Sequence, residues 1–252
     1  MPFVFAKSIS TTGEILAVRK SLEKELKYHL SAKGYAKLLK ALRPNIIQRD
    51  RLVNYYFDDS QLSLRKRRVG FRLRTTTGKE PMLTLKFPAK TKQKGPKGFK
   101  VRHEIEEPVS SRLAKAILSA ENPIHQIQGK ITQYLKALFP SRVIQDISLL
   151  GSLKTTRTKA SLEKQFLLEI DRSEMFGKKF YELEVETETP VKADLAVRKL
   201  LLITGLPYQP IEDSKLSRFL GEWQKRQAPI RRKTKKRAAR PQRSVTQRRR
   251  MR

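Results

Sequence analysis

The chain has 252 residues, of which 38% are hydrophobic and 32% are charged, so it can bury a core in one large domain or two small ones. Its 56 lysines and arginines against 24 acidic residues give a net charge of +32, which indicates attraction to polyanions. The absence of cysteine excludes a disulfide framework, a thiolate zinc site and a cysteine nucleophile. No apolar run approaches the roughly 20 residues of a membrane-spanning helix, so no membrane partner is expected.

Charge and periodicity divide the chain into three parts. We expect an N-terminal extension over 1–20, a folded domain over 21–223 and a disordered basic tail over 224–252. From Lys225 to Arg252 there are 14 basic residues, no acidic ones and no apolar periodicity, a composition that cannot bury a core. We expect a soluble, cytoplasmic protein, although the sequence does not distinguish this location from an organelle or the nucleus.

The folded part is predicted to alternate strands with a few helices. Period-two patterns predict strands over 22–30, 51–59, 69–76, 81–89, 99–109, 143–161, 165–173 and 179–188. Helical spacing predicts helices over 31–43, 111–120, 130–139 and 191–205. Ser31 is a predicted N-cap, Gly205 a predicted left-handed cap, and Gly78 and Gly177 mark turns.

Charged residues recur at every second position on several of these strands and therefore share one face of each strand. They are Glu23, Glu25 and Lys27; Arg72 and Arg74; Lys86; Arg102, Glu104 and Glu106; Glu169 and Asp171; and Glu182, Glu184 and Glu186. One interpretation is an ordinary sheet with a solvated face. Exposed ion pairs contribute only ~0–1 kcal/mol, however, so a solvated face gains little from such sorting. A closed antiparallel barrel with a polar lumen and an apolar outside covered by helices explains the pattern.

The chemistry of such a lumen follows from its residue types. Clustered carboxylates repel one another unless cations lie between them, and oxygen ligands suit Mg²⁺ or Mn²⁺. Clustered arginines and lysines suit phosphate. A cavity that holds both groups is predicted to bind a metal-bound polyphosphate.

These residues resemble the CYTH superfamily, the triphosphate tunnel metalloenzymes, over roughly residues 20–222. The E-x-E-x-K hallmark of the family matches "EKELK", and the stretch "NYYFDDSQLSLRKRRVGFRLRT" resembles the turn and R-x-R strand that follow. Further matches are "LTLK", "RHEIEE", "LKTTR", "LLEIDRSEMFG", "YELEVE" and "DSKLSRFL". The resemblance implies an α+β fold, in which a closed eight-stranded antiparallel barrel forms a tunnel covered by several helices.

The resemblance also implies roles for individual residues. Phosphate would be held by Lys27, Arg72, Arg74, Lys86, Arg157 and Lys215. One or two divalent ions would be held by Glu23, Glu25, Glu104, Glu106, Asp171, Glu182 and Glu184. Catalysis would involve Glu23, Glu25, Lys27 and Lys215, and the residues do not identify the base among the glutamates.

The favoured function is metal-dependent hydrolysis of the terminal phosphate of inorganic tripolyphosphate or a related triphosphate. Thiamine triphosphatases of mammals carry a stacking tryptophan two residues before R-x-R, where this chain has Gly70. The alternatives are a class IV-type adenylyl cyclase and a non-catalytic protein that binds polyphosphate or RNA. The basic tail is expected to attach nonspecifically to RNA or another polyanion through counterion release. The sequence indicates no oligomeric state.

Overall fold

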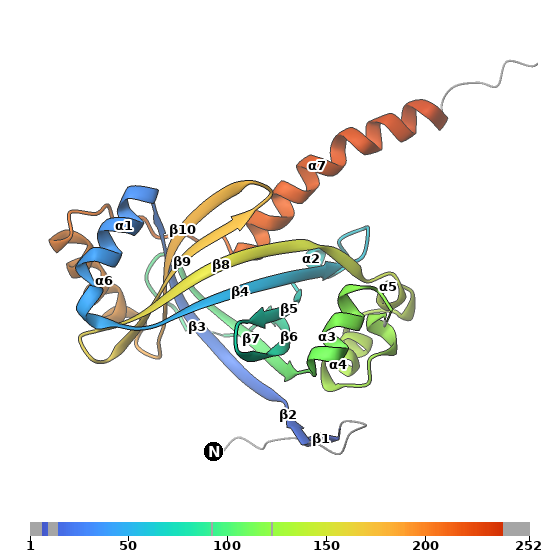
Figure 1. Ribbon diagram of the computed structural model, residues 1–252, viewed down its shortest axis with the longest axis horizontal. Helices are drawn as coiled ribbons and strands as arrows, with labels where there is room; N and C mark the ends of the chain where they lie inside the picture. The colour runs from blue at the N-terminus through green and yellow to red at the C-terminus, as the bar shows by residue number, and fades with distance from the viewer. Residues whose placement is uncertain (1–6, 10–14, 92, 122, 239–252) are drawn as a thin grey trace, which may run out of the picture. The chain divides into compact units, whose positions relative to one another are not determined.

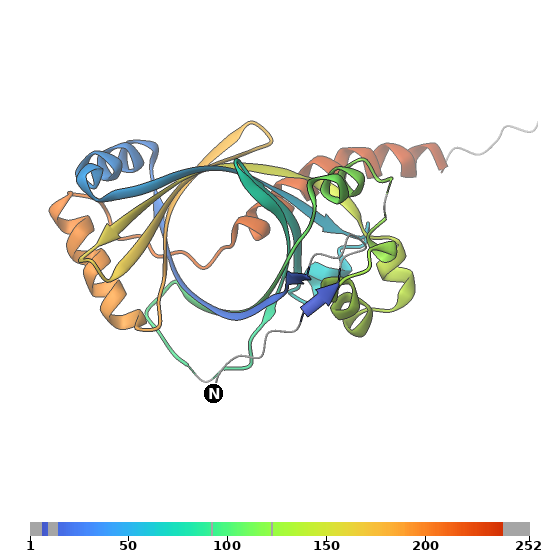
Figure 2. The ribbon, with the colours of Figure 1, turned by 60° about the horizontal axis from the view of Figure 1, so that its bottom comes forward.

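Eight antiparallel strands close into a barrel in the computed structural model, which describes residues 7–9, 15–91, 93–121 and 123–238 (Figures 1 and 2). The order around the barrel is β10-β3-β7-β6-β5-β4-β8-β9, and Figure 2 views the ring of strands end-on. The strands are β3 (Arg19–Leu30), β4 (Ile46–Asp58), β5 (Gly70–Thr76), β6 (Lys79–Pro88), β7 (Phe99–Pro108), β8 (Ser148–Leu162), β9 (Phe166–Met175) and β10 (Lys178–Glu186). The predicted closed, eight-stranded antiparallel barrel is confirmed.

Short helices connect the strands and cover the outside of the barrel. They are α1 (Ala32–Ala41), α2 (Ser63–Lys66), α3 (Ser111–Leu118), α4 (Lys130–Leu138), α5 (Ser141–Gln145) and α6 (Pro190–Ile203), with 3₁₀ turns η1 (Arg43–Asn45) and η2 (Ile124–Gln126). Strands β1 (Lys7–Ile9) and β2 (Ile15–Ala17) form a separate pair. Ser31 caps α1 by accepting from the Gly34 N–H, and Gly205 follows α6 with φ of 56°, as predicted. Across the described helices, none combines the length and the apolar character that a membrane crossing needs.

Two apolar cores lie on opposite outer faces of the barrel (Figure 1). On one face α1 and α6 pack against the outer side chains of β3, β9 and β10, among them Leu26 and Leu183. On the other face α3, α4 and α5 cover β5, β6 and β7, where Leu73 and Leu85 are fully buried. Because the apolar side chains point outward under the helices, the alternate positions of each strand point into the barrel.

Strand β3 illustrates this inversion. Leu26 and Tyr28 have no exposed surface and belong to the outer core, whereas Glu25 and Lys27 alternate with them and are 6% exposed. Neighbouring strands repeat the pattern in register, since Glu184 lies opposite Lys27 and Lys86 lies opposite Glu104. The barrel therefore has a charged lumen.

The predicted strand over 143–161 begins later than expected. Residues Ser141–Gln145 form α5, and β8 begins at Ser148. Ile144 and Ile147 are both buried in the outer core, and their separation of three residues places them on one side of a helical turn. In a strand these two side chains would point to opposite faces, so their burial in one core favours the helical turn that forms beside α4.

The chain divides into two compact units, Met1–Asp213 and Ser214–Arg252. The second unit contains α7 (Lys215–Ala238), which begins where Ser214 Oγ accepts from the Ser217 N–H. The helix continues to Ala238, into the segment whose composition predicts disorder. Arginine, lysine, glutamine and alanine are good helix formers, so the composition that prevents a core still permits a helix. The remainder of the predicted tail, 239–252, lies outside the described residues.

Candidate metal and phosphate site

Three carboxylates converge inside the barrel on β9 and β10. Oxygens of Asp171, Glu182 and Glu184 all lie within 4.8 Å of one another, and these residues are 0%, 1% and 5% exposed. Glu182 is paired directly with Asp171 across the two strands, and Glu184 follows two residues later on the same face. Strand register alone therefore brings the three acids together.

Arg157 on β8 lies against this cluster. Its Nε is 2.9 Å from Asp171 Oδ1, and one terminal nitrogen lies 2.6 Å from Asp171 Oδ2 and 2.9 Å from Glu184 Oε2. Its other terminal nitrogen contacts Glu169. Burial disfavours the charged guanidinium, but Asp171 and Glu169 outweigh it and raise the pKa of Arg157 well above its ordinary value. Arg157 thus stays charged and offsets part of the negative charge of the cluster.

Lys27 reaches the same cluster from β3. Its Nζ is 2.5 Å from Glu184 Oε1 and 3.1 Å from Glu25 Oε2. Burial would lower the pKa of Lys27, yet Glu184 and Glu25 hold it well above its ordinary value. Burial raises the pKa of Glu25 despite the nearby Lys27. The E-x-E-x-K strand is therefore tied to the acidic cluster through its lysine.

A second group of charges lies across β3, β6 and β7. Lys86 Nζ bridges Glu23 Oε1 at 2.5 Å and Glu104 Oε1 at 3.2 Å, and a terminal nitrogen of Arg72 lies 3.3 Å from the same Glu104 oxygen. Burial opposes ionisation of Glu23, but the Lys86 ammonium brings the pKa of Glu23 below its ordinary value. Glu23 is consequently a carboxylate at neutral pH.

Arg74 has a neutral partner instead of a carboxylate. Its Nε donates to Asn54 Oδ1 at 2.9 Å on the neighbouring strand β4. Burial, together with the positive charges of Arg72 and Arg157, lowers the pKa of Arg74 to about 10. The β4–β5 side of the lumen is thus electropositive.

Several buried polar atoms on the lumen face have no hydrogen-bond partner within the part of the chain that the structure describes. They are Glu23 Oε2, Asn54 Nδ2, Arg72 Nε, Thr84 Oγ1 and Arg102 Nε. Buried polar groups are nearly always satisfied by protein or water, so a group of such atoms in one lumen fits a polar ligand or bound water. An orphaned carboxylate oxygen needs a cation or a donor, and the orphaned nitrogens need acceptors.

The structure brings most of the predicted site residues into two groups and leaves Glu106 and Lys215 outside them. Asp171, Glu182, Glu184, Arg157, Lys27 and Glu25 surround the acidic cluster, while Glu23, Lys86, Glu104, Arg72 and Arg74 form the second group. Glu106 lies two residues beyond Glu104, in register with Thr84 and Arg19. Lys215 is the first residue of α7 and belongs to the second unit, so its role stays a prediction.

Three lumen residues were missed by the sequence prediction: Asn54, Thr84 and Lys159. Arg102 and Glu169 were placed on the charged strand faces but were given no role in the site. Glu169 binds Arg157 and lies 3.3 Å from Lys159, so it belongs to the acidic cluster. Period-two alternation could have identified Thr84, two residues from Lys86, and Lys159, two residues from Arg157. Strand β4 carries no predicted site residue that would have marked Asn54.

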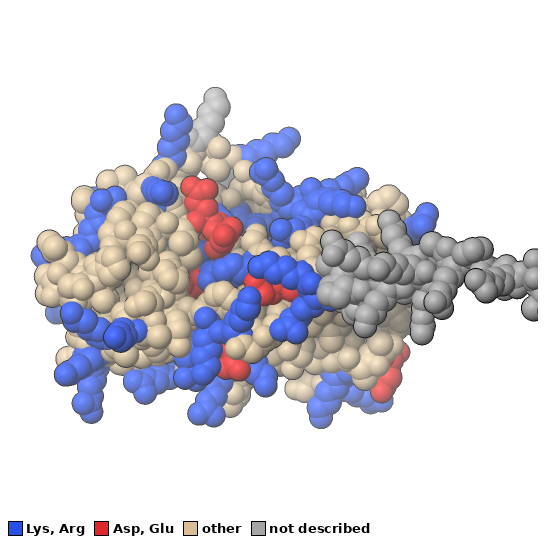
Figure 3. Space-filling model, turned by 90° about the horizontal axis from the view of Figure 1, so that it is seen from above, with Lys and Arg blue, Asp and Glu red and all other residues tan. Residues whose placement is uncertain are grey.

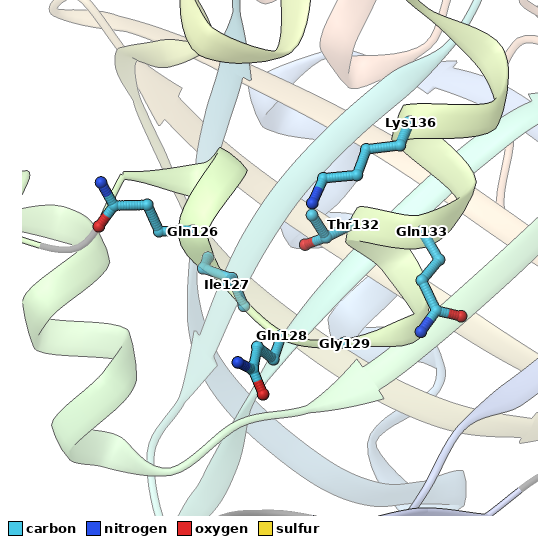
Figure 4. A pocket seen from close by; sticks show the side chains of 7 residues that line it. All are labelled: Gln126, Ile127, Gln128, Gly129, Thr132, Gln133 and Lys136. Carbon is cyan, nitrogen blue, oxygen red and sulfur yellow. The ribbon is translucent and has the colours of Figure 1, made fainter. Parts of the chain in front are cut away.

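The remaining surface offers a different kind of pocket. A hollow of about 420 Å³ near η2 and α4 is lined mainly by polar, uncharged side chains, including Gln126, Thr132 and Gln133, with Lys136 at its edge (Figure 4). None of the described residues that line it is a carboxylate, so it does not match the predicted metal chemistry. Lys and Arg side chains cover much of the face seen in Figure 3, with Asp and Glu gathered in a few places.

The residues present fit a divalent cation. Three carboxylates converge on one point, and Glu23 offers an oxygen without a partner among the described residues. Carboxylate oxygens are the ligands preferred by Mg²⁺ and Mn²⁺.

This chain is a tunnel protein by its fold, because its closed antiparallel barrel has apolar outer faces and a charged lumen. The CYTH domain model matches residues 21–220, and the chain therefore belongs to the CYTH family.

Two solved structures illustrate the likeness. A candidate adenylyl cyclase from Hippeastrum, described as having a dominant triphosphatase activity, has a TM-score of 0.70 and 20% identity, over 79% of this chain and 96% of that one. A candidate adenylate cyclase from Bacillus halodurans has a TM-score of 0.64 and 26% identity, over 79% of this chain and 98% of that one. No curated protein sequence matches the chain.

Proposed function

We propose that this protein is a divalent-metal-dependent triphosphatase that hydrolyses the terminal phosphate of inorganic tripolyphosphate inside its barrel. The observation that carries the proposal is the juxtaposition of Asp171, Glu182 and Glu184 with Arg157 and Lys27 in the lumen. Carboxylates alone would repel a triphosphate, and cationic side chains alone would bind it without holding the metal ion that hydrolysis requires. The two together suit a metal-bound triphosphate.

The acidic cluster would hold Mg²⁺ or Mn²⁺, with Glu23, Glu25, Glu104 and Glu106 as further candidate ligands. When bound, the ion would polarise phosphoryl oxygens and offset the charge that develops during transfer. Arg72, Arg74 and Lys86 would bind phosphate oxygens and align the chain of phosphates for in-line attack. Glu23, which is ionised and has one oxygen without a partner in the described part of the chain, would orient the attacking water.

Lys27 and Arg157 would change partners during binding. Both cations are held by carboxylates in this structure, at 2.5 Å for Lys27 to Glu184 and 2.6 Å for Arg157 to Asp171. A phosphate that takes over these cations leaves the carboxylates without their counter-charge, which a divalent ion restores. The arrangement therefore favours joint binding of metal and triphosphate.

Inorganic tripolyphosphate is preferred over an organic triphosphate because of Gly70. This residue begins β5, two positions before Arg72, and lies opposite Lys86. A glycine there offers no ring for stacking on a thiamine or a base, whereas the phosphate-binding arginines beside it remain.

Adenylyl cyclase activity is the second candidate, because the neighbour at 26% identity is described as a candidate adenylate cyclase. The product separates the two reactions, since a hydrolase releases phosphate and a cyclase releases pyrophosphate with a cyclic nucleotide. The Hippeastrum neighbour, with its reported triphosphatase activity, supports the hydrolase.

The experiment is a comparison of tripolyphosphate, ATP and thiamine triphosphate, each with Mg²⁺ or Mn²⁺ and with the products identified by ³¹P NMR. The proposal predicts phosphate release that is fastest with tripolyphosphate and absent without metal. Cyclic AMP as the main product from ATP would establish the cyclase. Absence of turnover with all three substrates would leave a binding protein.

A further inference from the structure

Two neutral side chains flank the arginines of β5 inside the barrel. Asn54 on β4 lies directly opposite Arg74, and Thr84 on β6 lies directly opposite Arg72. Both residues are 1% exposed. The three strands thus present a pair of arginines between an amide and a hydroxyl.

The orientation of the Asn54 amide is determined by its neighbour. Arg74 Nε can only donate, and it lies 2.9 Å from Asn54 Oδ1, so the oxygen faces Arg74 and the NH₂ group points elsewhere. Among the described residues Asn54 Nδ2 has no acceptor, and Thr84 Oγ1 and Arg72 Nε likewise have no partner. These three buried atoms on adjacent strands all have a proton to donate.

On β5 and β6 this wall carries Arg72, Arg74 and Lys86, and the carboxylates next to it, Glu104 and Glu106, lie on β7. Arg157 is surrounded by Asp171, Glu169 and Glu184, whereas among the described residues Arg74 donates to the Asn54 amide, and burial lowers the pKa of Arg74 to about 10. Arg72 shares a single Glu104 oxygen with Lys86. Cations and unpartnered donors without matching acceptors suit an anion.

Resting on the proposed function, we infer that Asn54 and Thr84 are additional phosphate-binding residues. Asn54 Nδ2 and Thr84 Oγ1 donate to oxygens of the phosphate group that Arg72 and Arg74 hold. A terminal phosphate has three non-bridging oxygens, which the two arginines and the two neutral donors share. Both donor atoms are buried beneath neighbouring side chains. A phosphate therefore reaches them only if the flexible Arg72 and Arg74 side chains change position as it binds.

The test is binding of inorganic tripolyphosphate, with Mg²⁺, to the full-length protein by isothermal titration calorimetry, separate from any measurement of turnover. Asn54→Asp keeps an oxygen for Arg74 but replaces the NH₂ donor with a second oxygen that repels phosphate. We expect it to weaken binding by at least about 30-fold and more than Asn54→Ala does. Thr84→Val should weaken binding about 10-fold, and Thr84→Ser should restore it.

The control for charge is Asn45→Asp, at an exposed position in η1, which should leave the affinity within about twofold. If Asn54 only holds Arg74 in place, Asn54→Asp binds as well as wild type while Asn54→Ala binds worse, and the inference is wrong. Binding that depends on Asn54 in a protein without turnover would support the inference and refute the proposed hydrolase. A wild-type protein that fails to bind tripolyphosphate would overturn both.

Discussion

The guanidinium of Arg157 and the carboxylate of Asp171 form a bidentate ion pair between β8 and β9. The Nε–Oδ1 distance is 2.9 Å and the second contact is 2.6 Å, with Asp171 wholly buried. Asp171 also belongs to the converging acidic cluster, so this cation occupies the neighbourhood in which a metal would lie. The stability of the protein without bound metal is therefore expected to depend on Arg157.

Replacing Arg157 should destabilise the protein and make it depend on metal. Arg157→Gln leaves Asp171 and Glu184 without a cation, and breaking a buried ion pair costs about 3–5 kcal/mol. Urea unfolding should show this loss, and Mg²⁺ should restore more stability to the variant than to wild type. Arg172→Gln, at an exposed neighbouring position on β9, is the control. An equal loss in both variants, or no rescue by Mg²⁺, would contradict the account.

Metal and tripolyphosphate should stabilise the protein together more than separately. Phosphate draws Lys27 and Arg157 away from their carboxylates, and the metal neutralises the charge that remains. Differential scanning fluorimetry should give a rise in Tm with both ligands that exceeds the sum of the separate rises. No shift at saturating levels of both would argue against the tunnel site.

Stability should respond to pH through Asp58, which is 2% exposed. Burial raises the pKa of Asp58 from an ordinary 3.8 to about 6, although three backbone N–H groups donate to its carboxylate. As pH rises, the Asp58 carboxyl ionises near pH 3.8 in the unfolded chain but only near pH 6 in the folded protein. Its contribution to the free energy of unfolding is therefore complete below pH 3.8 and is lost as pH rises through 6. Relative to Asp58→Asn, wild type should lose about 3 kcal/mol of unfolding free energy between roughly pH 3.5 and 7.

The adjacent Asp59 provides a control with the opposite sign. Burial would raise its pKa, but hydrogen bonds from the Ser63 backbone and hydroxyl lower it below 3.8. Its contribution to stability is therefore present above the ordinary pKa and is lost at more acidic pH. Wild type should gain stability relative to Asp59→Asn as pH rises through about 4. Parallel curves for the two variants would refute both assignments.

Asp194 on α6 should contribute to the stability of the fold without affecting hydrolysis of tripolyphosphate. Its carboxylate accepts from the Tyr28 hydroxyl at 2.7 Å, the Tyr208 hydroxyl at 2.8 Å and Arg198 Nε at 2.7 Å, on the outer side of β3. Asp194→Ala leaves the buried Tyr28 hydroxyl without its acceptor and should cost about 2–3 kcal/mol in denaturant unfolding. Asp146→Ala, at an exposed position, should cost less than about 0.5 kcal/mol. A large change in the KM for tripolyphosphate in Asp194→Ala, assayed while folded, would contradict this separation.

The basic C-terminal segment should set nonspecific affinity for polyanions. Truncation after Gln224 removes 14 basic residues, and binding to single-stranded RNA should weaken with a smaller dependence on salt concentration. Fluorescence anisotropy over a salt series measures both quantities. If truncation leaves the affinity and the salt slope unchanged, the segment has no such role.

Period-two alternation predicted much of the fold and of the lumen, because a strand has only two faces. Once Leu26 and Leu183 point outward, Glu25 and Glu184 must point inward. Alternation does not reveal which strands are neighbours, so the Lys27–Glu184 pair, formed by the contact of β3 with β10, could not be predicted. Asn54 and Thr84 were missed because neither carries a charge, so their role in the site could not be inferred before their hydrogen bonds were known, although alternation places Thr84 on the face of Lys86.

The most direct test of the account is metal-dependent release of phosphate from tripolyphosphate by wild type and by Glu23→Gln/Glu25→Gln. Glu163→Gln/Glu174→Gln removes the same charge from exposed positions outside the lumen and is the matched control. We predict turnover with Mg²⁺ or Mn²⁺ in wild type and in the control, and a loss of about 100-fold or more in the lumen variant. Equal turnover in all three proteins, or turnover without metal, would contradict a metal–triphosphate site inside the barrel.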